Sequence, residues 1–360
     1  MRVLILADDL TGALDTTCKF GRNSIVLLKG DLDAEFVGVS TFTRLLSPED
    51  ARTRLRDFLR KFSSWSYLYK KTDSTMRGNV GAELGELSFF TGSEVPFTPA
   101  YPEQGRLVIE GSLYVRGEPL DRTPYVSELP VKSSNILAIL RATTSARIGF
   151  WGEEDLDIAV FKDVRSREDL SEIINEILGE GLRVMGGSAG LAIELSEALG
   201  CVDAEPVRAE GPILFLSGST NDVTLEQISL LSREITVLGF GDEEIKLAGE
   251  LIKEGTDTAL SFHLGSVIGS MDKILELIID SRPSALVVIG GETLGAVLKG
   301  LDATAIRIGS YPEEGIAAGW LLGGPLDGTP LVSKAGGFGD PWTLVRVRRV
   351  LRGLSPAVST

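Results

Sequence analysis

The sequence predicts an α/β protein built from two α/β domains, each with a mostly parallel or mixed sheet flanked by helices. A chain of 360 residues is too long for one ordinary core and suits two domains. Short apolar runs alternate with amphipathic segments in a βαβα rhythm, which is typical of parallel strands covered by helices. Gly-rich turns follow several of the apolar runs. We expect the active site in the cleft between the two domains.

The first half of the chain contains the elements of one such domain. Short apolar runs predict strands at Val3–Ala7, Ser24–Leu28, Phe36–Ser40, Ser66–Lys70 and Val95–Thr98. Amphipathic segments predict helices at Ala13–Phe20, Pro48–Phe62 and Gly78–Phe89. The Gly- and Pro-rich stretch from Glu103 to Pro124 indicates a long active-site loop or a small β-excursion. A later strand, Arg183–Met185, leads into a glycine-rich turn and a helix that ends at Leu199.

The second domain is predicted to begin where the composition changes. Gly200–Gly211 is charged and rich in small residues without periodicity, which places the boundary between residues 1–205 and 206–360. From Ile213 onward the chain repeats the order strand, Gly-rich turn, helix. The clearest repeats cover Phe215–Leu231, Leu286–Leu301 and Leu331–Leu351.

Composition and charge exclude several classes of partner. A net charge of −15 argues against nucleic acid, whose phosphates need a basic face, but allows a small anionic substrate in a cleft that gathers a few arginines. No apolar run approaches the roughly 20 residues that cross a bilayer, and the chain starts on a strand rather than a leader. We therefore expect a cytoplasmic protein with no membrane partner. The single histidine, His263, excludes a His-clustered zinc site. The sequence leaves open whether the chain forms a homo-oligomer.

Two adjacent carboxylates, Asp8 and Asp9, directly follow the first predicted strand. Strands of an α/β sheet deliver such residues to the carboxyl edge, where these folds bind ligands. Because like charges repel, the pair adds little stability, and one member suits a general base or a partner for a metal ion. The alternative is that the two aspartates only cap the following helix.

Three Gly-rich turns in the second half stand between a strand and a helix. Glycines let the backbone approach an anion, and the free N–H groups at a helix start donate to it. Each turn alone could serve chain geometry, but three in one domain favour a nucleotide phosphate site. Neither the Walker pattern nor a strand-led G-x-G-x-x-G occurs. The candidate nucleotide-binding residues are Ser217, Ser219, Gly290, Gly291, Glu292, Thr293, Gly336 and Gly337.

Three arginines in the first half stand at strand ends or in loops. They are Arg44, Arg77 in the segment Lys71–Asn79, and Arg106 in the long loop. A guanidinium group binds a carboxylate in a bidentate manner, so the three suit an acidic substrate. The alternative for each is a solvated surface charge.

These segments together resemble the four-carbon acid sugar kinase family. The match runs in order through D-D-L-T-G-A from Asp8, K-T-D-S-T-M-R-G-N from Lys71, P-A-Y-P-E-Q-G-R from Pro99, G-S-A-G-L-A from Gly187, L-S-G-S from Leu216, G-G-E-T from Gly290 and K-A-G-G-F-G from Lys334. It covers nearly the whole chain. The family phosphorylates the terminal hydroxyl of four-carbon sugar acids such as 3-oxo-tetronate, threonate and erythronate, using ATP. The resemblance implies that residues 1–205 bind the acid and residues 206–360 bind the nucleotide.

Carried over residue by residue, the resemblance implies ATP contacts at the turn residues named above. It implies contacts with the acid at Asp8, Asp9, Arg44, Asp73, Arg77 and Arg106. One departure lies near the acid pocket: the usual T-D-S-R reads Thr41-Phe42-Thr43-Arg44 here, which removes a carboxylate.

Phosphoryl transfer requires positioning and charge neutralisation. We expect the turns to hold ATP, with Mg²⁺ bridging its β and γ phosphates, and Arg77 and Arg106 to hold the substrate carboxylate. Asp9 is the first candidate to accept the hydroxyl proton and Asp73 the second.

Two other functions are compatible with parts of the sequence. Gly186–Gly190 fits the G-x-S-x-G elbow of serine hydrolases, with Ser188 as nucleophile and His263 as its partner. No H-G-G-G-type oxyanion segment accompanies it. The other alternative is a non-catalytic sensor that binds a sugar acid or a nucleotide.

Overall fold

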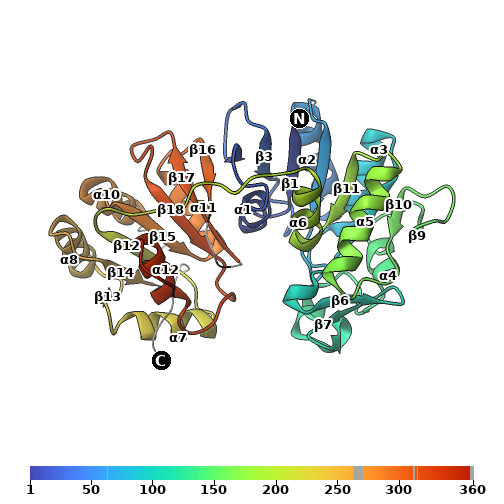
Figure 1. Ribbon diagram of the computed structural model, residues 1–360. Coiled ribbons are helices and arrows are strands. Elements are labelled where there is room, and N and C mark those ends of the chain that lie inside the picture. The colour runs from blue at the N-terminus through green and yellow to red at the C-terminus, as the bar shows by residue number, and fades with distance from the viewer. Residues whose placement is uncertain (63, 263–270, 311–312, 314, 357–360) are drawn as a thin grey trace. The chain divides into compact units, whose positions relative to one another are not determined.

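The computed structural model describes residues 1–62, 64–262, 271–310, 313 and 315–356. The chain forms two compact units (Figure 1). Unit 1 comprises Met1–Phe20 and Asp33–Val202, and unit 2 comprises Gly21–Leu32 and Asp203–Thr360. Within the described residues, no helix is both long and apolar enough to span a bilayer.

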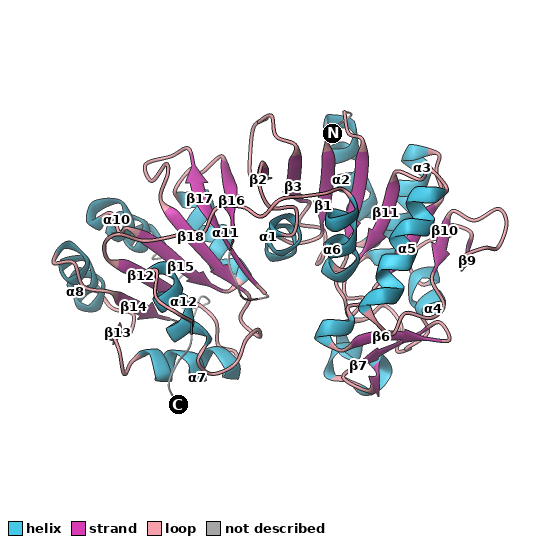
Figure 2. Ribbon diagram, in the orientation of Figure 1, coloured by secondary structure: helices cyan, strands magenta, loops and turns pink. Residues whose placement is uncertain are grey.

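Unit 1 is built on a parallel sheet with helices on both faces (Figure 2). Its strand order is β3-β1-β4-β11-β5-β10-β9, and every pair is parallel. The strands are β1 (Val3–Ala7), β3 (Phe36–Ser40), β4 (Tyr67–Lys71), β5 (Val95–Thr98), β9 (Ile148–Phe150), β10 (Ile158–Val160) and β11 (Val184–Gly187). The helices are α1 (Leu10–Cys18), α2 (Pro48–Lys61), α3 (Val80–Thr91), α4 (Ile136–Arg141), α5 (Arg167–Gly179) and α6 (Ala189–Ala198). Helices α1 and α5 each contact α6 in one layer, and α2 and α4 each contact α3 in the other.

Local sequence explains why these elements form. All five residues of β1 are buried, as expected for a strand covered on both faces. Helix α2 begins with Ser47 accepting from the N–H of Asp50 and with Pro48 at its first position. Helix α5 begins with a reciprocal capping box between Ser166 and Asp169.

A small antiparallel sheet projects from unit 1 between β5 and α4. It consists of β6 (Arg106–Ile109), β7 (Ser112–Val115) and β8 (Glu118–Pro119), flanked by the 3₁₀ turns η1 (Pro102–Gln104), η2 (Leu120–Arg122) and η3 (Pro124–Glu128). The prediction of a small β-excursion in this stretch is therefore confirmed.

Unit 2 contains a mixed sheet in the order β13-β14-β12-β15-β18-β17-β16-β2. Its strands are β2 (Ser24–Leu27), β12 (Ile213–Ser217), β13 (Thr236–Leu238), β14 (Thr258–Ser261), β15 (Ala285–Ile289), β16 (Ala305–Gly309), β17 (Ile316–Leu322) and β18 (Pro330–Lys334). The first five strands of this order, β13, β14, β12, β15 and β18, run parallel to their neighbours. The pairs β18–β17, β17–β16 and β16–β2 are antiparallel. The helices are α7 (Asp222–Leu231), α8 (Asp242–Lys253), α10 (Met271–Ser281), α11 (Gly291–Gly300) and α12 (Thr343–Leu351). Helix α12 contacts α7, and α10 contacts both α8 and α11.

The predicted α/β class with mixed and parallel sheets is confirmed. One element was misinterpreted: Ser24–Leu28 does not join the parallel rhythm of the first half. Its strand β2 pairs antiparallel with β16, with Ile25 opposite Arg307 and Leu27 opposite Ala305. Strands β9 and β10 and helices α4 and α5 were not predicted.

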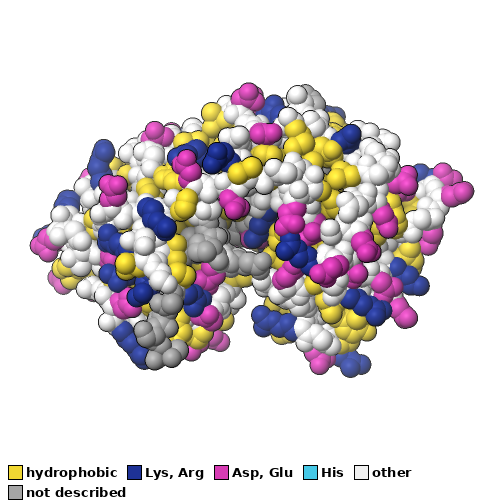
Figure 3. All heavy atoms as spheres, in the orientation of Figure 1, with side chains coloured by type: hydrophobic (Ala, Val, Ile, Leu, Met, Phe, Trp, Pro, Cys, Tyr) yellow, Lys and Arg dark blue, Asp and Glu magenta, His cyan; other side chains and the backbone are white. Residues whose placement is uncertain are grey.

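Charged side chains of both signs are mixed on one face of the molecule (Figure 3). On the face shown in Figure 3, the Lys and Arg side chains of the described residues are interspersed with Asp and Glu. That face of the described residues presents no broad basic area of the kind that nucleic acid requires.

Candidate active site

In unit 1, the carboxyl ends of β1 and β4 mark a topological switch point. Strand β1 lies between β3 and β4, and the chain reaches these neighbours through α1 on one face and α2 on the other. Open α/β sheets bind ligands in the crevice at such a point. Asp8 and Asp9 leave β1 there, and the segment Thr72–Arg77 leaves β4.

Arg44 joins the two aspartates. Its Nε and Nη2 donate to the Asp8 carboxylate at 2.7 and 3.0 Å, and its Nη1 forms an ion pair with Asp9. Burial alone would raise the pKa of Asp8, but the charge and hydrogen bonds of Arg44 outweigh it, helped by Lys70 and Lys71, and lower that pKa. Asp8 is therefore a charged anchor for Arg44 rather than a proton acceptor.

Asp9 caps helix α1 and remains partly accessible. Its Oδ1 accepts from the N–H of Gly12 at 2.6 Å, and its side chain is 27% exposed. Burial raises the pKa of Asp9 and the negative charge of Asp8 adds to the effect, although Arg44 opposes both. A Cβ on Gly12 would lie 2.6 Å from Asp9 Oδ1, so a larger residue there would displace the Asp9 carboxylate. The capping alternative is thus correct for Asp9, and it leaves a carboxylate with a raised pKa at the edge.

Asp73 forms a bidentate salt bridge with Arg77. The Nε and Nη2 of Arg77 donate to Asp73 at 2.9 and 3.0 Å, and Thr75 donates to it as well. Burial would raise the pKa of Asp73, but the hydrogen bonds and charges of Arg77 and Arg44 lower it well below its usual value. Asp73 is therefore a poor proton acceptor and a good positioning group for Arg77.

Arg106 carries a buried charge without a carboxylate partner among the described residues. Its side chain is 8% exposed and its Nη1 donates to the carbonyl of Gln104, but its Nε has no hydrogen-bond partner there. Burial lowers the pKa of Arg106. The nearby charges of Arg116 and Arg77 act in the same direction, whereas Tyr125 and Asp73 oppose them. Such a group is stabilised by an anion that binds beside it.

A buried ion pair between β4 and α3 supports the carboxyl edge of the unit 1 sheet. Lys70 Nζ lies 3.2 Å from Glu83 Oε2, and the two side chains are 0% and 1% exposed. Thr43 donates to the other oxygen of Glu83 at 2.5 Å. Asn79 donates to the carbonyls of Thr43 and Leu46 at 2.9 Å each. This network fixes the loop that carries Arg44.

Unit 2 has a second switch point, between β12 and β15. The three Gly-rich turns follow β12, β15 and β18, which are neighbouring parallel strands. A Cβ on Gly218 would lie 2.2 Å from Thr293 Oγ1, and one on Gly336 would lie 2.5 Å from Ser219 Oγ. The predicted turn residues are therefore brought together.

The start of α11 and one hydroxyl of these turns are available to an anion. Gly290 has φ +102° and precedes α11, whose first turn has no side-chain cap. Ser217 Oγ is buried and has no hydrogen-bond partner among the described residues. An orphaned hydroxyl beside an uncapped helix start suits phosphate oxygens.

Sequence reasoning missed several residues that hold the third turn. Lys334 is fully buried and donates to the carbonyls of Ala335 and Gly336 at 3.0 and 3.2 Å. Burial lowers the pKa of its ammonium group to about 8, against a weaker opposing effect of Glu313. Thr224 on α7 also donates to the Gly336 carbonyl, at 2.7 Å. Lys334 stood in a recognised motif, but nothing in the sequence showed that its charge would be buried.

The residues of the hydrolase alternative are placed differently from a nucleophile and its base. Ser188 is fully buried, caps α6 through the N–H of Gly190 and donates to the carbonyl of Ala100 at 2.5 Å. His263 lies outside the described residues. The predicted nucleophile therefore serves as a helix cap.

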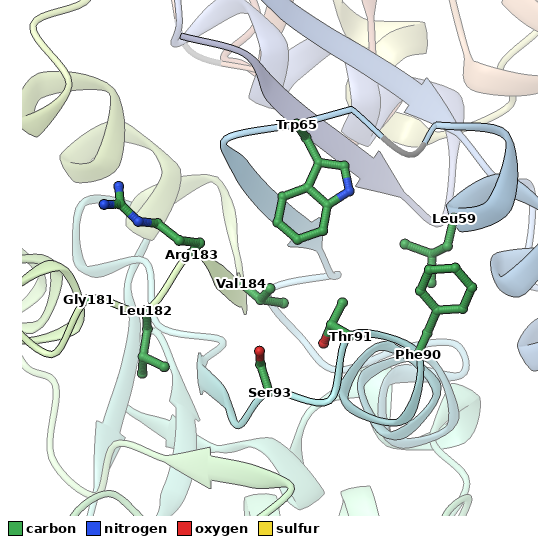
Figure 4. A pocket seen from close by; sticks show the side chains of 9 residues that line it. All are labelled: Leu59, Trp65, Phe90, Thr91, Ser93, Gly181, Leu182, Arg183 and Val184. Atoms are coloured by element: carbon green, nitrogen blue, oxygen red, sulfur yellow. The ribbon is translucent and has the colours of Figure 1, made fainter.

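A separate cavity of about 410 Å³ lies at the other edge of the unit 1 sheet (Figure 4). It is lined by Leu59, Trp65, Phe90, Thr91, Ser93, Gly181, Leu182, Arg183 and Val184. Trp65, Ser93 and Arg183 precede β4, β5 and β11, so this cavity belongs to the amino ends of the strands. It contains none of the predicted site residues.

Comparison with known proteins finds a family model in each half of the chain. The family model of a sugar-binding N-terminal domain matches residues 3–185, and that of a nucleotide-binding C-terminal domain matches residues 242–344. The chain is 27% identical to a D-threonate kinase of Bordetella bronchiseptica over 97% of both chains. It is 26% identical to a 3-oxo-tetronate kinase of Methylobacterium radiotolerans, over 93% of this chain and 95% of that protein. A D-erythronate kinase of Heliobacterium modesticaldum is 24% identical over 94% of each.

Among solved structures, two share the fold. A protein of Salmonella typhimurium LT2, described as a putative tRNA synthase, superposes with a TM-score of 0.81 at 20% identity over 97% of this chain and 99% of that one. The Haemophilus influenzae protein HI1011 gives 0.75 at 17% identity over the same shares. The fold and site thus define a protein with a sugar-binding and a nucleotide-binding domain. The chain belongs to the four-carbon acid sugar kinase family.

Proposed function

We propose that the protein is an ATP-dependent kinase that phosphorylates the terminal (C4) hydroxyl of a four-carbon sugar acid such as 3-oxo-tetronate, threonate or erythronate. The observation that best supports an acid substrate is the buried, unmatched guanidinium of Arg106. Arg77 lies in the same region and interacts electrostatically with Arg106. A substrate carboxylate would neutralise the charge of Arg106. The relatives' activities supply the reaction type.

Residues of unit 2 are proposed to hold the nucleotide. The N–H groups of Gly291 and Glu292 at the start of α11, with the hydroxyls of Ser217, Ser219 and Thr293, would bind its phosphates. Gly336 and Gly337 would let the third turn approach the same phosphates.

Mg²⁺ is proposed to enter together with ATP. Within the described residues, no group of three or more acidic, His or Cys side chains is placed to hold a metal ion by itself. Asp8, Asp9 and Asp73 are paired with arginines. Phosphate oxygens and water would therefore supply most of the ligands, with Glu292 as the acidic residue of the turns. When bound, Mg²⁺ supplies neutralisation of phosphate charge.

Asp9 is the better of the two candidate bases. In the proposed reaction the substrate hydroxyl oxygen bonds to the γ-phosphorus, the bond from that phosphorus to the bridging oxygen breaks, and ADP leaves. The hydroxyl proton passes to a carboxylate. Asp9 is partly exposed and has a raised pKa, whereas Asp73 is bound to Arg77 and has a lowered one. Asp8 and Asp73 then position Arg44 and Arg77.

The test is ADP release measured with ATP and a panel of D-threonate, D-erythronate and 3-oxo-tetronate. We expect release that depends on one of these acids and a phosphorylated product by mass spectrometry. The neutral alcohol threitol, which lacks the carboxylate, should give no release above background. Acid binding without any acid-dependent release would instead support the sensor alternative.

A further inference from the structure

The turn η3 presents one face to the arginines of the acid site. The centre of the Arg77 guanidinium lies 5.5 Å from the centroid of the Tyr125 ring, and Arg77 Nη1 lies 3.6 Å from Glu128 Oε1. Residues three apart in a 3₁₀ helix lie on the same side, which explains why both reach Arg77. Tyr125 also interacts electrostatically with Arg106. Nothing in the sequence pattern had pointed to either residue.

At this point one guanidinium has two acidic partners and another has none among the described residues. Arg77 is satisfied twice, by the bidentate contact with Asp73 and by Glu128. Arg106 has no acidic partner among the described residues. Arg116, at the exposed tip of the β7–β8 hairpin, adds a charge that solvent screens. Arg106 is therefore left to pair with one substrate carboxylate, whereas Arg44 and Arg77 already have acidic partners.

We infer that Glu128, with Tyr125 beside it on η3, restricts the acid site to monocarboxylic sugar acids by occupying Arg77 so that a second carboxylate cannot bind there. The inference rests on the proposed function and deepens it. A four-carbon dicarboxylate such as tartrate resembles the sugar acids in length and hydroxyl pattern, but it replaces the terminal hydroxymethyl group with a second anion. In the wild-type site that anion meets Glu128 instead of a free guanidinium, and like-charge repulsion rejects it.

Tyr125 has a distinct part in this arrangement. Its ring packs on the Arg77 guanidinium, a contact that holds the guanidinium plane while leaving its charge unchanged. Tyr125→Phe keeps the ring and should preserve discrimination between the acids. Tyr125→Leu removes the ring and should weaken the binding of all acids without favouring tartrate.

The decisive experiment compares Glu128→Gln with Glu118→Gln. Glu118 lies on β8 of the same small sheet, is exposed, and serves as a control with the same change of charge. Binding of D-threonate and of tartrate is measured by calorimetry on the full chain without ATP. Inhibition of ADP release by tartrate is measured in parallel. We expect Glu128→Gln to bind tartrate up to about fivefold more tightly than wild type, the upper size of one exposed charged contact, with D-threonate affinity changed less than threefold. Glu118→Gln should match wild type.

Three outcomes would overturn the inference. Tartrate could bind the wild type as tightly as D-threonate does, or its affinity could be the same in Glu128→Gln and wild type. In the third outcome, Glu118→Gln gains as much affinity for tartrate as Glu128→Gln. In each case acid-dependent ADP release would still support the kinase. Absence of that release with all three sugar acids would instead refute the proposed function.

Discussion

Replacing Lys70 with methionine tests how much the buried pair beneath the acid site contributes to unit 1. Methionine keeps the length and apolar body of the lysine side chain and removes its charge. Glu83 would then be a 1% exposed carboxylate with no cation 3.2 Å away. The variant therefore isolates the charge from the packing.

The expected loss follows from the contacts that remain. Removing one partner of a buried pair destabilises a protein by about 3–5 kcal/mol. Thr43 continues to donate to Glu83 at 2.5 Å, which places the expected loss near the lower end of that range, about 3 kcal/mol. The double variant Lys70→Met/Glu83→Leu removes both charges, so we expect it to lie within about 1 kcal/mol of wild type.

The loss should also depend on pH in a definite direction. Burial raises the pKa of Glu83, and Lys70 opposes that rise, so the pKa rises further when the lysine is absent. A carboxylate with a raised pKa in the folded state binds more protons there than in the unfolded state. Stability therefore increases as the pH falls through that pKa. The deficit of Lys70→Met should shrink between pH 7 and pH 5.

Hydrogen exchange of the α3 backbone amides measures this free energy for unit 1 separately from unit 2. Arg60→Met is the control, because its ion pair with Asp57 at 3.8 Å joins side chains that are 66% and 68% exposed. It should change the exchange little. Equal protection of α3 in Lys70→Met and wild type would refute the reasoning. A double variant less stable than the single one would do so too.

Three further predictions concern the site. Asp9→Asn should lower kcat by about 10²–10⁴ while the melting temperature stays nearly unchanged, because asparagine also caps helices; a near-normal kcat removes Asp9 as the base. Arg106→Ala should raise the KM for the acid by about tenfold or more through loss of a charged contact, with the KM for ATP unchanged; an unaltered KM for the acid contradicts carboxylate binding. Burial lowers the pKa of Lys334 from 10.5 to about 8, so the folded state loses this proton at a lower pH than the unfolded state. The free energy of unfolding of the wild type should therefore rise from pH 8 to pH 10, toward a limit of about 3 kcal/mol. Lys334→Met should lack this rise in urea unfolding at the two pH values and should bind ATP more weakly; a parallel pH dependence in both proteins would show that Lys334 is not the titrating group.

The strands could be predicted where local sequence decides the outcome. The strands β1, β3 and β5 have their predicted bounds because a short buried run between polar segments has few alternatives. Strand β2 shows the limit of this reasoning. Its partner β16 begins at Ala305, and no local pattern states whether a four-residue run pairs parallel or antiparallel, or with which partner.

The same limit applies to the site. The sequence placed Asp8, Asp9 and Arg77 at strand ends, because the carboxyl edge of a parallel sheet collects whatever follows its strands. It did not predict that Arg44 joins Asp8 to Asp9, since this pairing depends on the loop held by Asn79. The burial of Glu83 is the clearest feature that the sequence did not predict. A charged residue on a predicted amphipathic helix is expected to face solvent, yet Glu83 is buried because Lys70 on β4 is buried opposite it.

The two switch points use different chemistry because their expected ligands differ. Unit 2 offers backbone N–H groups, hydroxyls and glycines, which contact several phosphate oxygens while adding few fixed charges to the turns. Unit 1 offers guanidinium groups, most of them already matched by carboxylates. Matched arginines have a fixed geometry and little net attraction for anions in general. The one unmatched guanidinium, among the described residues of this cluster, then determines what binds. Selectivity for a sugar acid therefore depends as much on Asp73 and Glu128, which occupy Arg77, as on Arg106, which is left with an unmatched charge.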